Sequence, residues 1–282
     1  MNSETVHGKF AGRVVIVTGA STGIGWAIAR AFAREGARVV LAARQADRLQ
    51  RAASEIQEQT GQPVWAVPTD VTRRADVDHL VNQTIQRHGR IDILVNNAGS
   101  GLIAPFAGID LHDAVALFET NFWGAFHCAQ AVIPHLKQQR GGQIILIAAA
   151  AGLYGIPNSS VYSASKAALL ALADAMRIEL ASCGITVSVV CPSRVRLDET
   201  RFFDSARKYG PIDLYKTPGL LSVDAVAQAV LAAAARRRRL VILPAHAKLL
   251  YLASRFAPRI LDRILYRSMP KLAATHPPSS SA

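Results

Sequence analysis

The sequence is poor in cysteine and contains no long uncharged apolar run. Its three cysteines are odd in number and form no CxxC pair, so they fit small buried residues in a reducing compartment such as the cytoplasm better than disulfide partners. No stretch reaches the roughly 18 uncharged apolar residues of a membrane-spanning helix, and the N-terminal residues lack the apolar core of a secretory signal. The eight histidines have no metal-ligand spacing, so we expect no metal site.

Acidic residues are also scarce: 20 aspartates and glutamates stand against 32 lysines and arginines, which gives a net charge of +12. Such an excess can favour nucleic acids, membranes or anionic substrates, or it can form an ordinary solvated surface. We expect no nucleic-acid partner, because few aromatic residues lie among the basic ones and no recognised binding motif is present. Many of the basic residues lie near the C-terminus, in the run 236–239 and at Lys248, Arg255, Arg259, Arg263 and Arg267.

Short β-branched apolar runs alternate with stretches of helical periodicity along most of the chain. This order predicts an α/β fold with a single doubly wound, Rossmann-type parallel sheet and helices on both of its faces. Half of the 282 residues are hydrophobic, which is enough to bury one large core. The expected strands are 13–20, 38–44, 63–71, 91–99, 142–150, 185–192 and 239–245; the expected helices are 25–37, 46–61, 73–89, 111–139 (interrupted or ended near Pro134), 163–184 and 223–236.

The C-terminal third has a looser pattern than the rest. We expect one domain over 1–270, with an irregular segment at about 193–222 and a disordered tail at 271–282. A basic amphipathic helix is expected at about 247–267, as a C-terminal helical extension. It can lie on an anionic bilayer, cover a substrate or contact another subunit, and the sequence leaves these alternatives open. Its expected apolar face contains Leu249, Leu252, Phe256, Ile260 and Ile264.

The first expected strand runs into the glycine-rich stretch TGASTGIG at 18–25, which a helix follows. Glycines at these positions allow a tight turn and let backbone N–H groups approach a phosphate. The positive N-terminal end of the helix then favours a bound anion. A glycine turn alone is weak evidence, but its place at the first strand–helix junction of a doubly wound sheet favours nucleotide binding.

The spacing Thr-Gly-x-x-x-Gly-x-Gly occurs together with NNAG at 96–99 and YSASK at 162–166. With these motifs in this order, residues 10–195 or so resemble the short-chain dehydrogenase/reductase family. The resemblance implies a nicotinamide dinucleotide cofactor, a carbonyl or alcohol substrate, a substrate mouth near 193–222, and a homodimer or homotetramer. The cofactor-binding residues that it implies are Gly19, Ser21, Thr22, Gly23, Ile24, Gly25, Arg44, Asp70, Val71, Asn97, Ala98, Gly99, Tyr162, Lys166, Pro192 and Val195.

The residue at the end of the second strand usually decides between NAD(H) and NADP(H) in this type of fold. A carboxylate there binds the free ribose hydroxyls of NAD. In this sequence Ala43 and Arg44 occupy the position, and a guanidinium can pair with a 2′-phosphate through two hydrogen bonds. We therefore expect NADP(H) rather than NAD(H); the alternative is that Arg44 is an ordinary solvated loop residue.

Tyr162 and Lys166 are four residues apart at the start of a helix, so their side chains share a face. An ammonium beside a phenol favours the phenolate and lowers the pKa of tyrosine, which is near 10 when free. The resemblance implies that Tyr162 is the general acid/base and that Lys166 assists it and holds the nicotinamide ribose. It also implies that Asn121 bends its helix and holds a water that links the lysine to solvent. The alternatives are a surface Tyr/Lys pair and a helix-kink amide without a relay.

A serine is expected by resemblance thirteen residues before the tyrosine, and this position is Ala149. By analogy with the loss of one oxyanion-hole donor, its absence could cost about 3 kcal/mol, or roughly 10²–10³ in rate. The alanine can be an engineered change, a natural divergence with a substitute donor, or the mark of a relative that binds cofactor without catalysis. In CPSRVRL at 191–197, Ser193 and Leu197 also replace the glycine and the threonine of the family pattern.

These motifs predict an NADP(H)-dependent oxidoreductase, an alcohol dehydrogenase or ketoreductase that interconverts an alcohol with a ketone or aldehyde. Ala149 leaves open whether its activity is reduced. One alternative is a non-catalytic NADP(H)-binding relative with a regulatory or scaffolding role. Another is a peripheral membrane-binding module that uses the basic C-terminus.

Overall fold

A single parallel sheet organises the chain. The computed structural model describes residues 8–197, 208–209 and 220–268, and within them seven strands lie in the order β3-β2-β1-β4-β5-β6-β7. Every neighbouring pair is parallel, as the buried apolar runs predict. The strands are β1 (Val14–Thr18), β2 (Arg38–Ala43), β3 (Val64–Pro68), β4 (Ile93–Asn96), β5 (Gly142–Ile147), β6 (Ile185–Pro192) and β7 (Leu240–Leu243).

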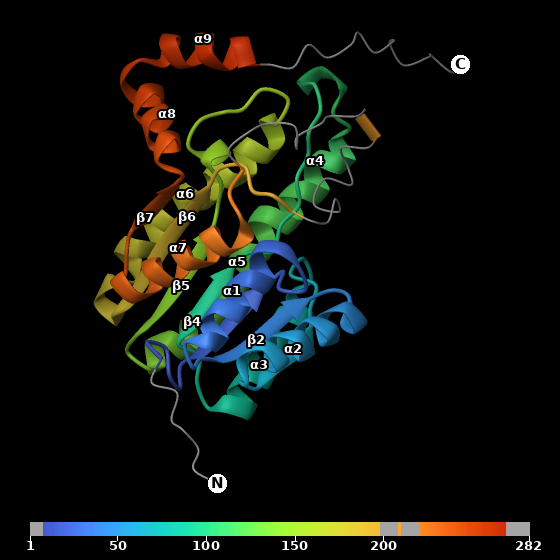
Figure 1. The fold of residues 1–282 in the computed structure, drawn as a ribbon, viewed down its shortest axis with the longest axis vertical. Coiled ribbons are helices and arrows are strands. Elements are labelled where there is room, and N and C mark those ends of the chain that lie inside the picture. Colours follow the sequence, from blue (N-terminus) through green and yellow to red (C-terminus); the bar gives the residue numbers. More distant parts are fainter. Residues whose placement is uncertain (1–7, 198–207, 210–219, 269–282) are drawn as a thin grey trace.

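Helices cover both faces of the sheet, which confirms the doubly wound fold (Figure 1). Alternate residues of β1 point to opposite faces: Ile16 packs with α3, α5 and α6, whereas Val15 and Val17 pack with α1, α2 and α7. The helices are α1 (Gly23–Arg34), α2 (Ala46–Thr60), α3 (Arg74–His88), α4 (Leu111–Phe118), α5 (Gly124–Gln138), α6 (Ser160–Glu179), α7 (Val223–Arg236), α8 (Ala245–Phe256) and α9 (Pro258–Ser268).

The strand order reverses between β1 and β4, and this reversal positions the site. β1 pairs with β2 on one side and with β4 on the other, so the connections leave the sheet in opposite directions at this point. In doubly wound sheets a ligand binds beyond the carboxyl ends of the strands at such a reversal. The glycine-rich turn after β1 and the NNAG motif after β4 both lie there.

The helix expected over 111–139 is interrupted, but not at Pro134. The interruption is a wider π turn at Glu119–Trp123, between α4 and α5, whereas Pro134 lies inside α5. A proline within a helix removes one backbone hydrogen bond. Val132 and Leu136, on either side of it, are fully buried against the sheet, and this packing keeps α5 continuous.

The expected C-terminal helix at 247–267 is two helices, α8 and α9. Ala257 separates them with φ −142° and ψ 56°, because the ring of Pro258 disfavours helical backbone in the residue before it. The expected apolar face is therefore divided between two helix axes. Among the described residues, no helix combines the length and the apolar character needed to cross a membrane. The expected tail at 271–282 and most of the segment expected at 193–222 lie outside the described residues.

Candidate active site

The turn between β1 and α1 needs glycine for two separate reasons. Gly19 and Gly23 have φ values of +64° and +58°, in the left-handed region that other residues rarely adopt. Gly25 has an ordinary φ, but a Cβ there would lie against the carbonyl oxygen of Gly19 and 2.5 Å from Nδ2 of Asn97. The three glycines thus make a turn that packs closely on the end of β4.

Thr18 and Asn97 join the ends of β1 and β4. The Oγ1 of Thr18 accepts hydrogen bonds from the backbone N–H groups of Asn97 and Ala98, each at 3.0 Å. The Nδ2 of Asn97 donates to the carbonyls of Thr18 (3.0 Å) and Gly19 (3.2 Å). These four bonds hold the glycine turn and the NNAG segment as one unit at the strand reversal.

The N-terminus of α1 is open to an anion. Its cap residue, Thr22, makes no side-chain cap hydrogen bond, and no acidic residue occupies the first turn. The first backbone N–H groups of the helix and its dipole therefore remain available to a phosphate. Ser21 and Ile24, which the resemblance also implicates, lie half-buried in the same turn.

Arg44 and Asp70 follow neighbouring strands but have different surroundings. Arg44 is exposed directly after β2, which pairs with β1. The Oδ1 of Asp70 accepts hydrogen bonds from the backbone N–H (3.0 Å) and the hydroxyl (2.8 Å) of Thr72, so this carboxylate also shapes the turn before α3. Val71 is buried and leaves no room for a side chain at Gly124 of α5.

Tyr162 and Lys166 lie together on α6, with the ammonium 5.9 Å from the centroid of the phenol ring. Lys166 is 4% exposed, and its Nζ donates to the carbonyl of Ile147 at 3.0 Å. Burial lowers the pKa of Lys166 to about 8. Burial, with a smaller contribution from the nearby Cys191, raises the pKa of the Tyr162 phenol.

The expected lowering of the tyrosine pKa by its ammonium neighbour is therefore wrong for this structure. Removal of the phenol from water opposes its ionisation and is the larger of the two causes that raise its pKa, with Cys191 the smaller. At neutral pH the pair consists of a neutral phenol and an ammonium that is mostly protonated. A neutral phenol is the form that donates a proton.

Asn121 lies in the π turn and is fully buried. Its Oδ1 accepts from the backbone N–H of Ser100 (2.8 Å), and its Nδ2 donates to the carbonyl of Ser100 (3.0 Å) and to the hydroxyl of Ser165 (3.1 Å). A Cβ at Gly99 would lie 3.0 Å from Oδ1 of Asn121 and 3.4 Å from Nζ of Lys166. Gly99 thus brings the NNAG segment, the asparagine and the lysine together.

Ala149 is buried just after β5, with extended backbone. The turn after it is pressed against α6, since a Cβ at Gly152 would lie 2.7 Å from the carbonyl carbon of Lys166. The thiol of Cys191 lies within hydrogen-bonding reach of the backbone N–H of Ala149 and close enough to Lys166 to interact with its charge. Burial raises the pKa of Cys191 to about 12, so the thiol is neutral.

The segment after β6 also reaches the site. Pro192 is buried at the end of the strand, and Val195 forms a parallel bridge with Leu221. Ser193 donates its backbone N–H to the carbonyl of Leu243 at 2.8 Å. The side chain of Leu197 lies beside the glycine turn, with Cδ2 3.4 Å from the position of a Cβ at Gly23. An apolar side chain thus lies beside the glycine turn at the position where the family pattern has a threonine.

Sequence reasoning missed three residues of this region: Thr18, Ser165 and Cys191. Thr18 and Ser165 belong to the quoted motifs TG and YSASK, so the motifs were the available signal for them. The hydroxyl of Ser165 donates to the carbonyl of Tyr162 at 2.8 Å and accepts from Asn121. Cys191 gave no signal, because only the pairing of β5 with β6 brings it beside Ala149.

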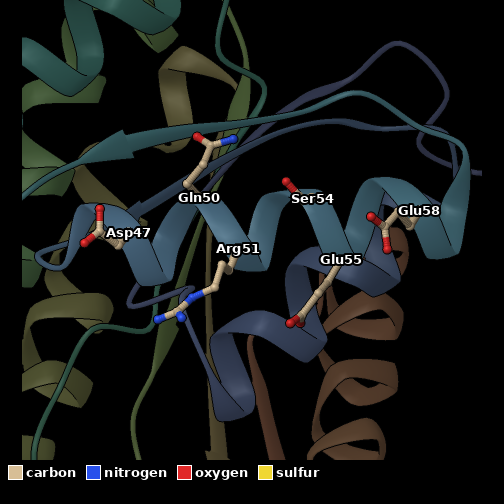
Figure 2. Close-up of a pocket in the computed structure, with 6 residues that line it drawn as sticks. All are labelled: Asp47, Gln50, Arg51, Ser54, Glu55 and Glu58. Atoms are coloured by element: carbon tan, nitrogen blue, oxygen red, sulfur yellow. The ribbon is translucent and has the colours of Figure 1, made fainter.

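Two hollows lie outside this strand edge. One, of about 410 Å³, is lined by residues of α2 alone, so neither the strand ends nor the glycine turn contribute to it (Figure 2). The other, of about 760 Å³, lies between the segment 151–157, the outer face of α6 and α9. The 410 Å³ hollow on α2 is lined by Asp47, Gln50, Arg51, Ser54, Glu55 and Glu58.

Comparison with known proteins agrees with this geometry. Residues 13–208 match the family model described as short chain dehydrogenase. The ketoacyl reductase HetN of Nostoc sp. is 35% identical over 90% of this chain and 88% of its own length. The 11-beta-hydroxysteroid dehydrogenase-like protein 4A of Arabidopsis thaliana is 36% identical over 92% and 84%.

A solved structure gives the same result. The alcohol dehydrogenase of the archaeon Thermococcus sibiricus, complexed with 5-hydroxy-NADP, superposes with a TM-score of 0.70. It is 29% identical and covers 82% of this chain and 94% of its own. The chain belongs to the short-chain dehydrogenase family of oxidoreductases.

Proposed function

We propose that the chain is an NADP(H)-dependent oxidoreductase that interconverts an alcohol with a ketone or aldehyde. The observation that carries this proposal is the meeting of Lys166 with Asn121 and Gly99 at the strand reversal, with Tyr162 on the same face of α6. This arrangement supports the assignment of Tyr162 as an acid/base group and of Lys166 as a cation that acts beside a bound dinucleotide. A phenol that donates or accepts a proton is compatible with reduction of a carbonyl group and oxidation of an alcohol.

The cradle fits a dinucleotide. A Cβ at Gly19 would lie 2.8 Å from the Cα of Ala98, so only glycine lets the turn approach the NNAG segment this closely. Gly19, Gly23 and Gly25 with the N-terminus of α1 would hold the pyrophosphate. Asn97 and Ala98 would lie beside the adenosine ribose, and Asp70 and Val71 beside the adenine.

The proposed preference for NADP(H) over NAD(H) rests on Arg44. Its guanidinium is exposed directly after β2, where a carboxylate would repel a 2′-phosphate. The Thermococcus sibiricus dehydrogenase supports the proposal, since it was solved with an NADP derivative.

The bound dinucleotide would supply or accept the hydride. In the reducing direction the neutral phenol of Tyr162 would donate its proton to the carbonyl oxygen of the substrate. The ammonium of Lys166 would stabilise the phenolate that remains, and would hold the nicotinamide ribose. Asn121, fixed by Ser100 and Ser165, would hold a water that returns the proton from solvent. Each group would act from a buried or half-buried position.

The substrate is proposed to be an apolar carbonyl compound or its alcohol. Ala149 offers a methyl group in place of a hydroxyl after β5, whereas its neighbours Ala148 and Ala150 pack in the core. The printed names of the relatives, a ketoacyl reductase and a hydroxysteroid dehydrogenase-like protein, refer to apolar substrates. This agreement supports the class without choosing a compound.

A homodimer or homotetramer is also proposed. Leu111 and Val115 of α4 and Ile178 of α6 are large apolar residues at the surface, and Ile178 is 81% exposed. Apolar side chains in this number on adjoining helices favour self-association. Light scattering of the purified protein measures the mass directly, and a monomer would contradict the proposal.

Ala149 favours a second candidate, a non-catalytic NADP(H)-binding relative. The methyl group offers no hydrogen bond to a substrate oxygen, and the neutral Cys191 thiol is a weak donor. Such a protein would bind NADPH and signal through its surface.

A binding titration followed by a carbonyl screen separates the candidates. NADPH should bind more tightly than NADH, and some apolar ketone or aldehyde should drive oxidation of NADPH. The Tyr162→Phe variant should keep NADPH affinity within about twofold and lose the turnover by roughly 10²–10⁴. Tight NADPH binding without turnover on any carbonyl would favour the second candidate. Equal weak binding of both dinucleotides would contradict both.

A further inference from the structure

The C-terminal helices α8 and α9 expose a row of large apolar side chains. Leu249, Leu252 and Phe256 follow one another along one face of α8, and Phe256 is 84% exposed. Ile260 and Ile264 of α9 add to the row and are 58% and 45% exposed. Several large apolar side chains exposed on two consecutive helices mark an interaction site more often than a single exposed residue does.

This apolar row is not the face by which α8 packs on the protein. Ala247 is buried, and Leu250 and Tyr251 pack against the core from the opposite side of the helix. In α9, Leu261 and Leu265 likewise pack against the core. The inner faces of both helices are thus buried against the protein, whereas the outer apolar side chains are exposed and can contact a partner.

Positive charge surrounds the row. Between residues 245 and 267 the chain has five lysines and arginines and one acidic residue, Asp262. Three of them, Arg259, Arg263 and Arg267, are exposed and share one face of α9, next to Ile260 and Ile264. An apolar strip bordered by arginines complements the anionic headgroups and acyl boundary of a bilayer.

The four-arginine run does not belong to this surface. Residues 236–239 precede β7 and α8 follows it, so the run and the helices lie at opposite ends of the strand. Arg239 donates to the carboxylate of Asp174 at 2.9 Å. Figure 1 shows α8 leaving the sheet and α9 lying across its far end, away from α7. The run therefore offers a matched control for charge.

We propose that the outer face of α8 and α9 binds the surface of an anionic membrane. The interaction would be peripheral, on a protein otherwise in the cytoplasm, with the apolar row in the acyl boundary and the arginines at the headgroups. The 760 Å³ hollow is lined by Asp262, Leu265 and Tyr266 of α9 together with the segment that follows Ala149. The helix that carries part of the proposed membrane surface therefore lies beside the segment that follows Ala149.

Vesicle co-sedimentation of the full chain tests this proposal. Vesicles of phosphatidylcholine with roughly one-third phosphatidylserine should sediment the protein, and pure phosphatidylcholine should do so much less. Arg259→Gln/Arg263→Gln/Arg267→Gln should weaken binding by about 100-fold, since each charge near an anionic surface is worth about fivefold. Leu252→Ser/Phe256→Ser should weaken it by about tenfold or more for each side chain.

Two controls remove the same chemistry from elsewhere. Arg236→Gln/Arg238→Gln changes charge at the other end of β7, and Phe106→Ser removes an apolar side chain that is 78% exposed in the short helical turn Phe106–Gly108. Both should bind vesicles like the unaltered protein. All altered side chains are exposed, so the melting temperatures of the variants should equal that of the unaltered protein. This measurement checks that every variant folds.

Three results would overturn the proposal: no sedimentation with anionic vesicles, equal sedimentation with both lipid compositions, or equal loss in the controls. A second copy of the chain is the competing occupant. Two results together would indicate this second copy. Leu252→Ser/Phe256→Ser would lower the mass measured by light scattering, and the unaltered protein would not bind vesicles.

Discussion

The turn after β1 and the segments after β5 and β6 lie at the same edge of the sheet, but they differ in completeness. The first has three features that favour phosphate binding: left-handed glycines, an open helix N-terminus and a Thr18–Asn97 network. The second keeps Tyr162 and Lys166 but has Ala149 in place of a hydroxyl. Binding and chemistry are thus supported by separate parts of the chain, and substitutions can alter one without the other.

Ala149→Ser should have the largest effect, since it would supply the donor that the second region lacks. We expect carbonyl-dependent NADPH oxidation to rise by roughly 10²–10³. NADPH affinity should stay within about twofold, because Ala149 lies outside the glycine turn. Ala148→Ser, one residue earlier and also buried, is the control and should give no gain. An unchanged rate with Ala149→Ser would mean that another group already fills this role.

The burial of Lys166 should appear in the pH dependence of stability. Its pKa falls from 10.5 to about 8 in the folded chain. Between these values the unfolded chain holds a proton on this lysine that the folded chain has lost, so the contribution of Lys166 to the free energy of unfolding rises with pH, by about 3 kcal/mol in all.

Lys166→Met should lack this contribution, so denaturant unfolding at pH 7.5 and 10 should show the unaltered protein gaining about 2 kcal/mol of stability relative to the variant. The exposed Lys137→Met is the control and should keep the rise. A pH-independent difference between Lys166→Met and the unaltered protein would contradict the proposed burial of the charge.

Gly25→Ala should distort the turn after β1 and leave the segments after β5 and β6 unchanged. Its Cβ would meet the carbonyl of Gly19 and the Nδ2 of Asn97, so the turn must shift. We expect a loss of about 2 kcal/mol in stability and a comparable loss in NADPH binding. Gly108→Ala, where a Cβ meets open space, should change neither. Thermal melting measures the stability, and a fluorescence titration measures the affinity for NADPH. If Gly25→Ala bound NADPH as tightly as the unaltered protein, the glycine turn would not be the dinucleotide site.

Arg44→Ala should have the smallest effect, because the guanidinium is exposed. Loss of an exposed phosphate contact costs about 1–2 kcal/mol, so NADPH affinity should fall by about tenfold. NADH affinity should not change, which removes the preference between the two dinucleotides. Arg38→Ala, exposed at the other end of β2, is the control. If Arg44→Ala weakened the binding of both dinucleotides equally, Arg44 would not be the residue that binds the 2′-phosphate.

The sequence predicts the sheet well because its signals are local. β-branched runs, glycine stops and the strand–helix alternation each act within a few residues, and the structure confirms the doubly wound fold. The glycine turn was also predictable, since two of its glycines are required by the backbone itself. Pro258 was a visible signal for the break between α8 and α9, but the continuous apolar periodicity favoured one helix.

Long-range effects in the site were not predictable in the same way. The direction of the Tyr162 pKa depends on how much water the folded chain removes from the phenol, and the four-residue spacing to Lys166 contains no information on this. The place of Cys191 beside Ala149 depends on strand pairing between β5 and β6. The π turn at Asn121 depends on hydrogen bonds to Ser100 and Ser165, far away in sequence.

The most direct test of the account compares Ala149→Ser with Ala149→Ser/Tyr162→Phe in carbonyl-dependent oxidation of NADPH. If Tyr162 donates the proton, the rate gained with the serine should fall by roughly 10²–10⁴ when the phenol hydroxyl is removed, while both proteins bind NADPH equally. A double variant as fast as the single one would show that the proton comes from elsewhere, and the central role given to Tyr162 would be wrong.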